Sequence, residues 1–197
     1  GKEKTRAGGR ATAVPDVFPI VGIGASAGGL ETVTQFLKHL PDRPGMAFVL
    51  VQHLDPTHES ALASLLSRAT SMEVTEAKNN TRLQPNRMYV IPPNKVIGVV
   101  DRRLRVSPRK SIKDIHAPID HFFESLAEQE GSRSIGVILS GNGSDGTRGL
   151  LAIKSAGGIT FAQDEKSAKY PGMPASAIAS GCVDFVFPPD RIARELK

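Results

Sequence analysis

Cysteine is nearly missing from this chain of 197 residues, and long apolar stretches are missing altogether. Because Cys182 is the only cysteine, no internal disulfide can form, as is usual for cytoplasmic proteins. No apolar run approaches the ~18 residues that a membrane-spanning helix needs, and no signal-peptide pattern opens the sequence. We therefore expect a cytoplasmic protein with no segment inserted in a membrane.

Aromatic side chains are also few, at 5% of the residues, and tryptophan is absent. Little surface is therefore available on which nucleic-acid bases can stack. The formal net charge of +5 is unevenly distributed, because residues 1–14 alone carry four basic residues against one acidic residue. The rest of the chain lacks the strong basic character typical of nucleic-acid-binding proteins, and we expect no nucleic-acid partner.

Apolar residues make up 40% of the sequence, enough for one sizeable core, and we expect one domain over residues 15–197. Residues 1–14 are polar and without periodicity, which predicts a flexible tail or linker remnant. Strand and helix patterns alternate along the rest, which is typical of an α/β fold with a doubly wound, mostly parallel sheet flanked by helices. Short strands at 88–91, 96–100 and 104–106 are expected to form an antiparallel extension. The other expected strands are 17–23, 46–52, 135–139, 159–162 and 183–187, and the expected helices are 30–37, one beginning at Asp55, 118–127, 149–155 and one containing 178–179.

The stretch G-I-G-A-S-A-G-G at residues 22–29 follows the first expected strand and matches two different motifs. It fits the dinucleotide-binding fingerprint G-x-G-x-x-G/A, in which the start of a helix binds a pyrophosphate. It also fits G-x-S-x-G, the tight turn that exposes a nucleophilic serine above a sheet. The nucleotide interpretation requires an acidic residue at the tip of the second strand, to bind the ribose hydroxyls. His53 is at that tip instead, which favours a nucleophilic serine at Ser26.

Three polar residues follow the ends of three expected strands: Ser26, His53 and Asp145. The carboxyl ends of the strands in a doubly wound sheet meet at one edge, where such folds bind their ligands. A serine needs a base to become nucleophilic, and the base needs an acid that fixes its tautomer and stabilises the imidazolium ion. The chain order Ser–His–Asp differs from the Ser–Asp–His order of α/β-hydrolases, which argues against that fold but not against the chemistry. Backbone N–H groups around Ser26 and in the Gly-Asn-Gly turn at 141–143 are candidates for binding a developing oxyanion.

Five stretches of the sequence resemble the catalytic domain of chemotaxis protein-glutamate methylesterases, the CheB type. In chain order they read G-A-S-A-G-G, V-Q-H-L-D-P, A-P-I-D-H-F-F, I-L-S-G-N-G-S-D-G and A-Q-D-E-K-S-A-K-Y-P-G-M-P, and the resemblance extends over residues 17–196. It implies that Ser26 is the nucleophile, His53 the general base and Asp145 the orienting acid. It also implies that a backbone N–H of the G-x-G turn binds the oxyanion, at Asn142. The candidate oxyanion and substrate-binding residues are Ala27, Asn142 and Gly143.

The activity implied by this resemblance is hydrolysis of γ-glutamyl methyl esters on chemoreceptors, with glutamine deamidation as a further activity. It implies no cofactor, and a methylated chemoreceptor or similar signalling protein as partner. The group His53-x-Asp55-x-x-His58 has no further Cys or His that would complete a metal site, so we expect no metal. The stretches G-A-S-A-G-G-L-E and Q-H-L-D-P-T-H-E look most like CheB–CheR fusion proteins, which implies fused methyltransferase and sensory domains. The alternative is a catalytically weak regulatory module that docks on the receptor.

Overall fold

The computed structural model describes residues 17–53, 61–109 and 117–196. The expected tail, residues 1–14, lies outside these segments. So does Asp55, at which the sequence predicts the start of a helix.

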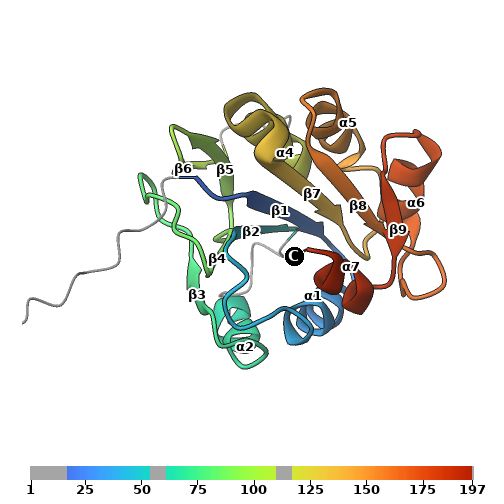
Figure 1. Ribbon diagram of the computed structural model, residues 1–197, viewed down its shortest axis with the longest axis horizontal. Coiled ribbons are helices and arrows are strands. Elements are labelled where there is room, and N and C mark those ends of the chain that lie inside the picture. Colours follow the sequence, from blue (N-terminus) through green and yellow to red (C-terminus); the bar gives the residue numbers. More distant parts are fainter. Residues whose placement is uncertain (1–16, 54–60, 110–116, 197) are drawn as a thin grey trace, which may run out of the picture.

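A seven-stranded sheet in the order β3-β4-β2-β1-β7-β8-β9 forms the centre of the molecule (Figure 1). Every pair of neighbouring strands in it is parallel. The doubly wound α/β prediction is therefore confirmed. The strands are β1 (Ile20–Ala25), β2 (Ala47–Gln52), β3 (Glu73–Glu76), β4 (Arg87–Val90), β7 (Ser134–Ile138), β8 (Ile159–Gln163) and β9 (Phe185–Phe187).

Helices cover both faces of this sheet (Figure 1). One face packs against α1 (Gly29–Lys38), α2 (Leu62–Ser67) and α7 (Pro189–Glu195). The other face packs against α4 (Pro118–Glu130), α5 (Thr147–Ser155), α6 (Gly172–Ala179) and the antiparallel hairpin of β5 (Lys95–Val100) and β6 (Arg103–Pro108). A short 3-10 helix, η1 (Gly131–Arg133), joins α4 to β7. Among the described segments, no helix has both the length and the apolar character needed to cross a bilayer.

The two faces of the sheet bury two separate apolar cores. All six residues of β1 are buried, as expected for a parallel strand that is covered on both sides. Helix α1 is amphipathic, and its buried positions Val33, Phe36 and Leu37 lie one turn apart on the face that contacts the sheet. Helix α4 covers the opposite core with Phe122 and Phe123. This packing fixes α1 and α4, whose first turns border the candidate site.

The expected strand at 88–91 belongs to a different part of the structure than the sequence suggests. It forms β4, which pairs in parallel with β2 and β3, so it belongs to the main sheet and not to the antiparallel extension. Only the strands at 96–100 and 104–106 form the expected antiparallel pair, as β5 and β6. Strand β3 and helix α7 were not expected from the sequence at all. Strand pairing depends on contacts with distant segments, which the local pattern of 88–91 does not contain.

The order of the strands determines where the site lies. Strand β1 is central, with β2 on one side and β7 on the other. The chain first builds the half of the sheet that contains β2 and then returns to build the half that contains β7. In open α/β sheets, ligands bind at the carboxyl ends of the strands where the direction of winding reverses. The carboxyl ends of β1, β2 and β7 meet at that point.

Candidate active site

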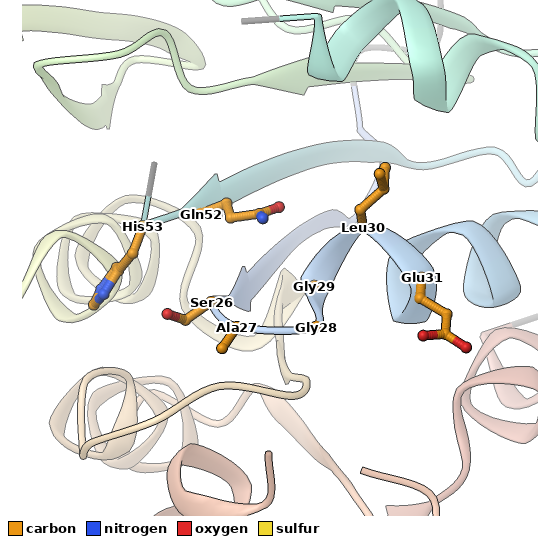
Figure 2. A pocket seen from close by; sticks show the side chains of 8 residues that line it. All are labelled: Ser26, Ala27, Gly28, Gly29, Leu30, Glu31, Gln52 and His53. Atoms are coloured by element: carbon orange, nitrogen blue, oxygen red, sulfur yellow. The ribbon is translucent and has the colours of Figure 1, made fainter. Parts of the chain in front are cut away.

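Ser26 lies in the tight turn between β1 and α1, at the edge of an open cleft of about 520 Å³ (Figure 2). The turn is held by the backbone of Ser26: its N–H donates to the carbonyl of Ser140 at 2.9 Å, and its carbonyl accepts from the N–H of Gly29 at 2.9 Å. Gly28 has φ +73°, a left-handed conformation that glycine adopts without strain. These backbone bonds fix the turn in a conformation in which Ser26 lines the cleft.

His53 and Asp145 form a direct hydrogen bond. The Nε2–H of His53, which follows β2, donates to Oδ2 of Asp145 at 2.7 Å. The imidazole is one-third exposed, whereas only 3% of the Asp145 side chain is exposed. Figure 2 shows the side chains of Ser26 and His53 on the same side of the cleft that both residues line. Within the described segments, no hydrogen bond joins the Ser26 hydroxyl to His53.

The carboxylate of Asp145 also binds the first turn of α4. Oδ2 accepts the backbone N–H of Ile119 at 3.0 Å, and Oδ1 accepts that of Asp120 at 2.9 Å. These N–H groups have no partner inside their own helix, and the positive end of the helix dipole favours an anion there. Asp145 is therefore fixed in position at the start of α4 while it orients His53.

Asp120 makes the reverse connection from α4 to α5. Its Oδ1 accepts the backbone N–H of Gly146 at 3.0 Å and that of Gly149 at 2.7 Å, at the start of α5. Burial raises the pKa of the Asp120 carboxyl, and the nearby charge of Asp145 acts in the same direction, against the hydrogen bonds from the two glycines. Each helix thus has its first turn capped by a carboxylate from the start of the other.

Ala27 lines the cleft, and Asn142 and Gly143 directly follow Gly141, which lies close to Ser26. In the described parts of the chain, the backbone N–H groups of Ala27, Asn142 and Gly143 donate to no protein acceptor. The N–H of Gly141, by contrast, donates to the carbonyl of Tyr170 at 2.8 Å. Of the Gly-Asn-Gly turn, only the second and third residues therefore retain a free donor. The candidate oxyanion residues Ala27, Asn142 and Gly143 all meet this requirement.

A family comparison fits this geometry. The profile of the CheB methylesterase family matches residues 21–196. The chain belongs to this family. The fold agrees with it as well: the crystal structure of the Thermotoga maritima CheB methylesterase catalytic domain superposes with a TM-score of 0.84 at 30% identity, over 91% of this chain and 97% of that one. The family resemblance of the sequence motifs is confirmed.

Curated relatives of this CheB methylesterase domain are longer proteins. A protein-glutamate methylesterase/protein-glutamine glutaminase of Rhizobium meliloti is 38% identical over 178 residues, which cover 90% of this chain and 50% of the relative. One from Myxococcus xanthus is 37% identical over 186 residues, covering 92% and 54%. The chain spans about half the length of these relatives. An uncharacterised 104.1 kDa protein of Rhodobacter capsulatus is 44% identical over 131 residues, which cover 66% of this chain but 14% of that protein.

Gly141 has a steric role in the CheB methylesterase domain that sequence reasoning missed. A Cβ atom at this position would lie 2.7 Å from Cβ of Ser26 and 2.8 Å from the sulfur of Met173. Only glycine lets the loop after β7 come this close to the serine. The sequence signal was the S-G-N-G run, but it was interpreted as a source of N–H donors alone. Asp120 was also missed, although it lies in the A-P-I-D-H-F-F stretch that resembles the family.

The described residues of this site include no cluster of metal ligands. In residues 17–53, 61–109 and 117–196, no three His, Cys, Asp or Glu side chains lie close enough together to hold a metal ion. Two further polar residues have surroundings of their own. Arg148, which is exposed on α5, pairs with Glu124 at 2.5 Å. The Cys182 side chain is buried. In the described part of the chain, the cleft that Ser26 lines also holds the imidazole of His53, which is bonded to the Asp145 carboxylate, an arrangement suited to acyl transfer.

Proposed function

We propose that the chain is the catalytic domain of a serine hydrolase that removes methyl groups from γ-glutamyl methyl esters of chemoreceptors. Ser26 is the nucleophile, His53 the general base and Asp145 the orienting acid. The observation that carries the proposal is the 2.7 Å bond between His53 and Asp145, which lies beside the cleft that Ser26 lines. Family membership supports the same assignment.

The first half of the reaction forms an acyl-enzyme. With Nε2 of His53 bonded to Asp145, Nδ1 is the ring nitrogen that takes the proton of the Ser26 hydroxyl. The serine oxygen then attacks the ester carbonyl carbon, and the imidazolium returns the proton to the methoxide leaving group, which departs as methanol. This proton transfer requires a direct hydrogen bond between the Ser26 hydroxyl and Nδ1 of His53 in the complex with substrate.

The second half of the reaction releases the glutamate side chain. His53 removes a proton from a water molecule, which attacks the acyl carbon, and the proton passes to Oγ of Ser26 as the acid leaves. In both halves negative charge develops on the carbonyl oxygen, and the N–H groups of Ala27, Asn142 and Gly143 supply donors for it. Attack on a glutamine side chain, with ammonia as the leaving group, follows the same steps and accounts for a deamidase activity.

The partner that this site fits is a protein that presents a short side chain. The cleft is open, and the small residues from Ser26 to Gly29 form half of its lining, together with Leu30, Glu31, Gln52 and His53. We propose a methylated chemoreceptor as substrate, a cytoplasmic location, and a longer chain in which methyltransferase and sensory domains are fused to this one. A 104.1 kDa protein matches this chain over 14% of its own length, which supports the presence of further domains in such a longer chain.

Release of methanol from a purified, methylated chemoreceptor signalling domain tests the proposal. We expect turnover with the wild-type protein and a loss of turnover in Ser26→Ala. A wild-type protein that binds the receptor domain but releases no methanol would support the docking module instead. Turnover that persists unchanged in Ser26→Ala would show that the nucleophile is a different residue.

A further inference from the structure

Ser140 is a fully buried residue that connects the segments around Ser26. Its hydroxyl donates to the carbonyl of Ala27 at 2.9 Å and accepts the N–H of Tyr170 at 3.1 Å. Its own carbonyl accepts the N–H of Ser26, and its N–H donates to Oε1 of Gln163, each at 2.9 Å. One side chain therefore joins the nucleophile turn, the end of β7 and the segment that precedes α6.

The bond to Ala27 determines which way a neighbouring peptide group points. In a planar trans peptide, the carbonyl and the N–H that follows it point in opposite directions. Because the Ala27 carbonyl is turned toward Ser140, the N–H of Gly28 is turned away from it. Ala27, Gly28 and Gly29 line the cleft, and the N–H groups of Ala27 and Gly28 have no acceptor in the described parts of the chain. Successive N–H groups on one side of a turn form a site for an anion.

We propose that Ser140 is a positioning residue for the ester hydrolysis proposed above, on which this inference rests. Its hydroxyl orients the Ala27–Gly28 peptide so that the N–H of Gly28 faces the cleft beside that of Ala27, as an additional donor to the oxyanion. The close fit of this contact is seen at Gly28, where a Cβ atom would lie 3.0 Å from Oγ of Ser140.

Loss of the hydroxyl frees this peptide to rotate. Its carbonyl oxygen then turns toward the cleft, where it repels the negative charge that develops in the transition state. The bound ester carries little charge on its carbonyl oxygen, so substrate binding is less affected. Among the described residues, Ser140 makes no hydrogen bond to His53 or Asp145, so we expect its removal to leave the His53–Asp145 bond in place.

Ser134 offers a matched control at the other end of the same strand. It is also fully buried, and its hydroxyl donates to the carbonyl of Gly131 at 2.6 Å. Ser134 begins β7, whereas Ser140 follows the end of this strand. Both alanine variants remove one buried hydroxyl that bonds to a backbone carbonyl, and Ser140→Ala also frees the N–H of Tyr170, so it is expected to lose somewhat more stability than Ser134→Ala.

The experiment measures kcat, KM and the pH profile of methanol release from a methylated receptor domain, with circular dichroism to verify folding. We expect Ser140→Ala to lower kcat about 10- to 100-fold, below the full loss of an oxyanion donor. KM and the pH midpoint should remain unchanged. Ser140→Thr, which keeps the hydroxyl, should recover most of the lost kcat, and Ser134→Ala should keep kcat within about twofold.

Three results would overturn the inference: an unchanged kcat in Ser140→Ala, an equal loss of kcat in Ser134→Ala, or a displaced pH midpoint in Ser140→Ala. A wild-type protein that releases no methanol overturns the proposed function itself, which is a different outcome. Should Ser140→Ala fail to fold, Ser140→Cys replaces it, because a thiol is a weaker donor than a hydroxyl. Full kcat in Ser140→Cys then counts against the inference.

Discussion

Ser26, His53 and Asp145 come from three loops, and a hydrogen bond holds the last two of them together. The imidazole of His53 is fixed by Asp145, which is in turn fixed by the N–H groups of Ile119 and Asp120. A base that is already oriented requires little rearrangement during the reaction. In the proposed mechanism, each of the three residues acts through the next, so none of them works alone.

The first prediction concerns this dependence. We expect Ser26→Ala and His53→Ala each to lower kcat by on the order of 10⁴–10⁶, and the double variant to lower it little further. The physical reason is that the base has no proton to accept once the serine hydroxyl is gone. The measurement is kcat for methanol release by the three variants. Losses that multiply in the double variant would show that the two residues act independently.

The second prediction concerns pH. His53 must be neutral to accept the serine proton, because a doubly protonated imidazole has no free lone pair at Nδ1. We expect kcat/KM to rise with pH until the base is fully neutral and then to level off. The measurement is the initial rate of methanol release at constant ionic strength. A profile that stays flat from pH 5 to 9 would point to a different base.

At the scale of elements, α4 and α5 are coupled by their exchange of capping carboxylates. The Asp120 carboxyl has a raised pKa. Because burial raises its pKa, the folded protein holds this proton up to a higher pH than the unfolded chain does. The resulting stabilisation is present in full below the ordinary value of 3.8 and is lost as pH rises through the raised pKa.

The third prediction follows from that sign. Asp120→Asn cannot titrate, yet its side-chain oxygen can still accept the N–H groups of Gly146 and Gly149. We expect the free energy of unfolding of the variant to increase relative to that of wild type as pH rises from about 4 to 7, because only wild type loses the contribution of the protonated Asp120. Urea denaturation at a series of pH values provides the measurement. A difference that is constant with pH, or that changes in the opposite direction, would contradict the assigned cause.

The loop after β7 gives the fourth prediction. In Gly141→Ala the added methyl group would lie 2.7 Å from Cβ of Ser26, so the serine must shift. We expect kcat to fall by about 10²-fold, the usual cost of a misplaced reacting group. Gly98→Ala in β5 is the control, because its added Cβ meets no atom closer than 3.5 Å, and it should retain activity. Equal effects of the two variants would argue against a steric cause.

The spacing of apolar residues in the sequence predicts most helices and strands, because the apolar positions match the faces that these elements bury. Strand β1 is apolar on both faces, and α1 has an apolar stripe with a period of one turn. The pattern failed for β3, which is short and has no buried residue, and for the pairing partners of β4. The candidate triad was found because each residue follows a strand. Ser140 was not singled out, because its importance comes from contacts with Ala27 and Tyr170 that lie far away in the sequence.

At the scale of the whole molecule, the open cleft is the feature that bears on substrate choice. The described residues that line it are mainly small or polar, with Leu30 the single large apolar side chain among them, so little apolar surface is available to hold a long acyl chain. A receptor domain, by contrast, binds over a larger surface than the reacting side chain alone. Binding energy from that surface can be used to align the ester with Ser26.

The fifth prediction compares substrates of different size. We expect kcat/KM to be much higher for a methylated receptor domain than for free glutamate methyl ester, with a lower kcat as well as a higher KM for the free ester. Both substrates are measured with one enzyme preparation. Equal values, or a preference for long-chain acyl esters, would contradict the receptor assignment and leave a serine hydrolase of a different substrate class.

The central position of β1 sets the dimensions of this site. Ser26 and His53 directly follow β1 and β2, which are hydrogen-bonded neighbours, and strands in a sheet lie about 4.8 Å apart. The sheet therefore sets the spacing between the serine and the histidine, while the start of α4 fixes Asp145. Insertions far out in the loops leave this spacing unchanged. A domain of this kind can thus diversify the surface around its cleft over evolutionary time while the separation between its reacting groups stays constant.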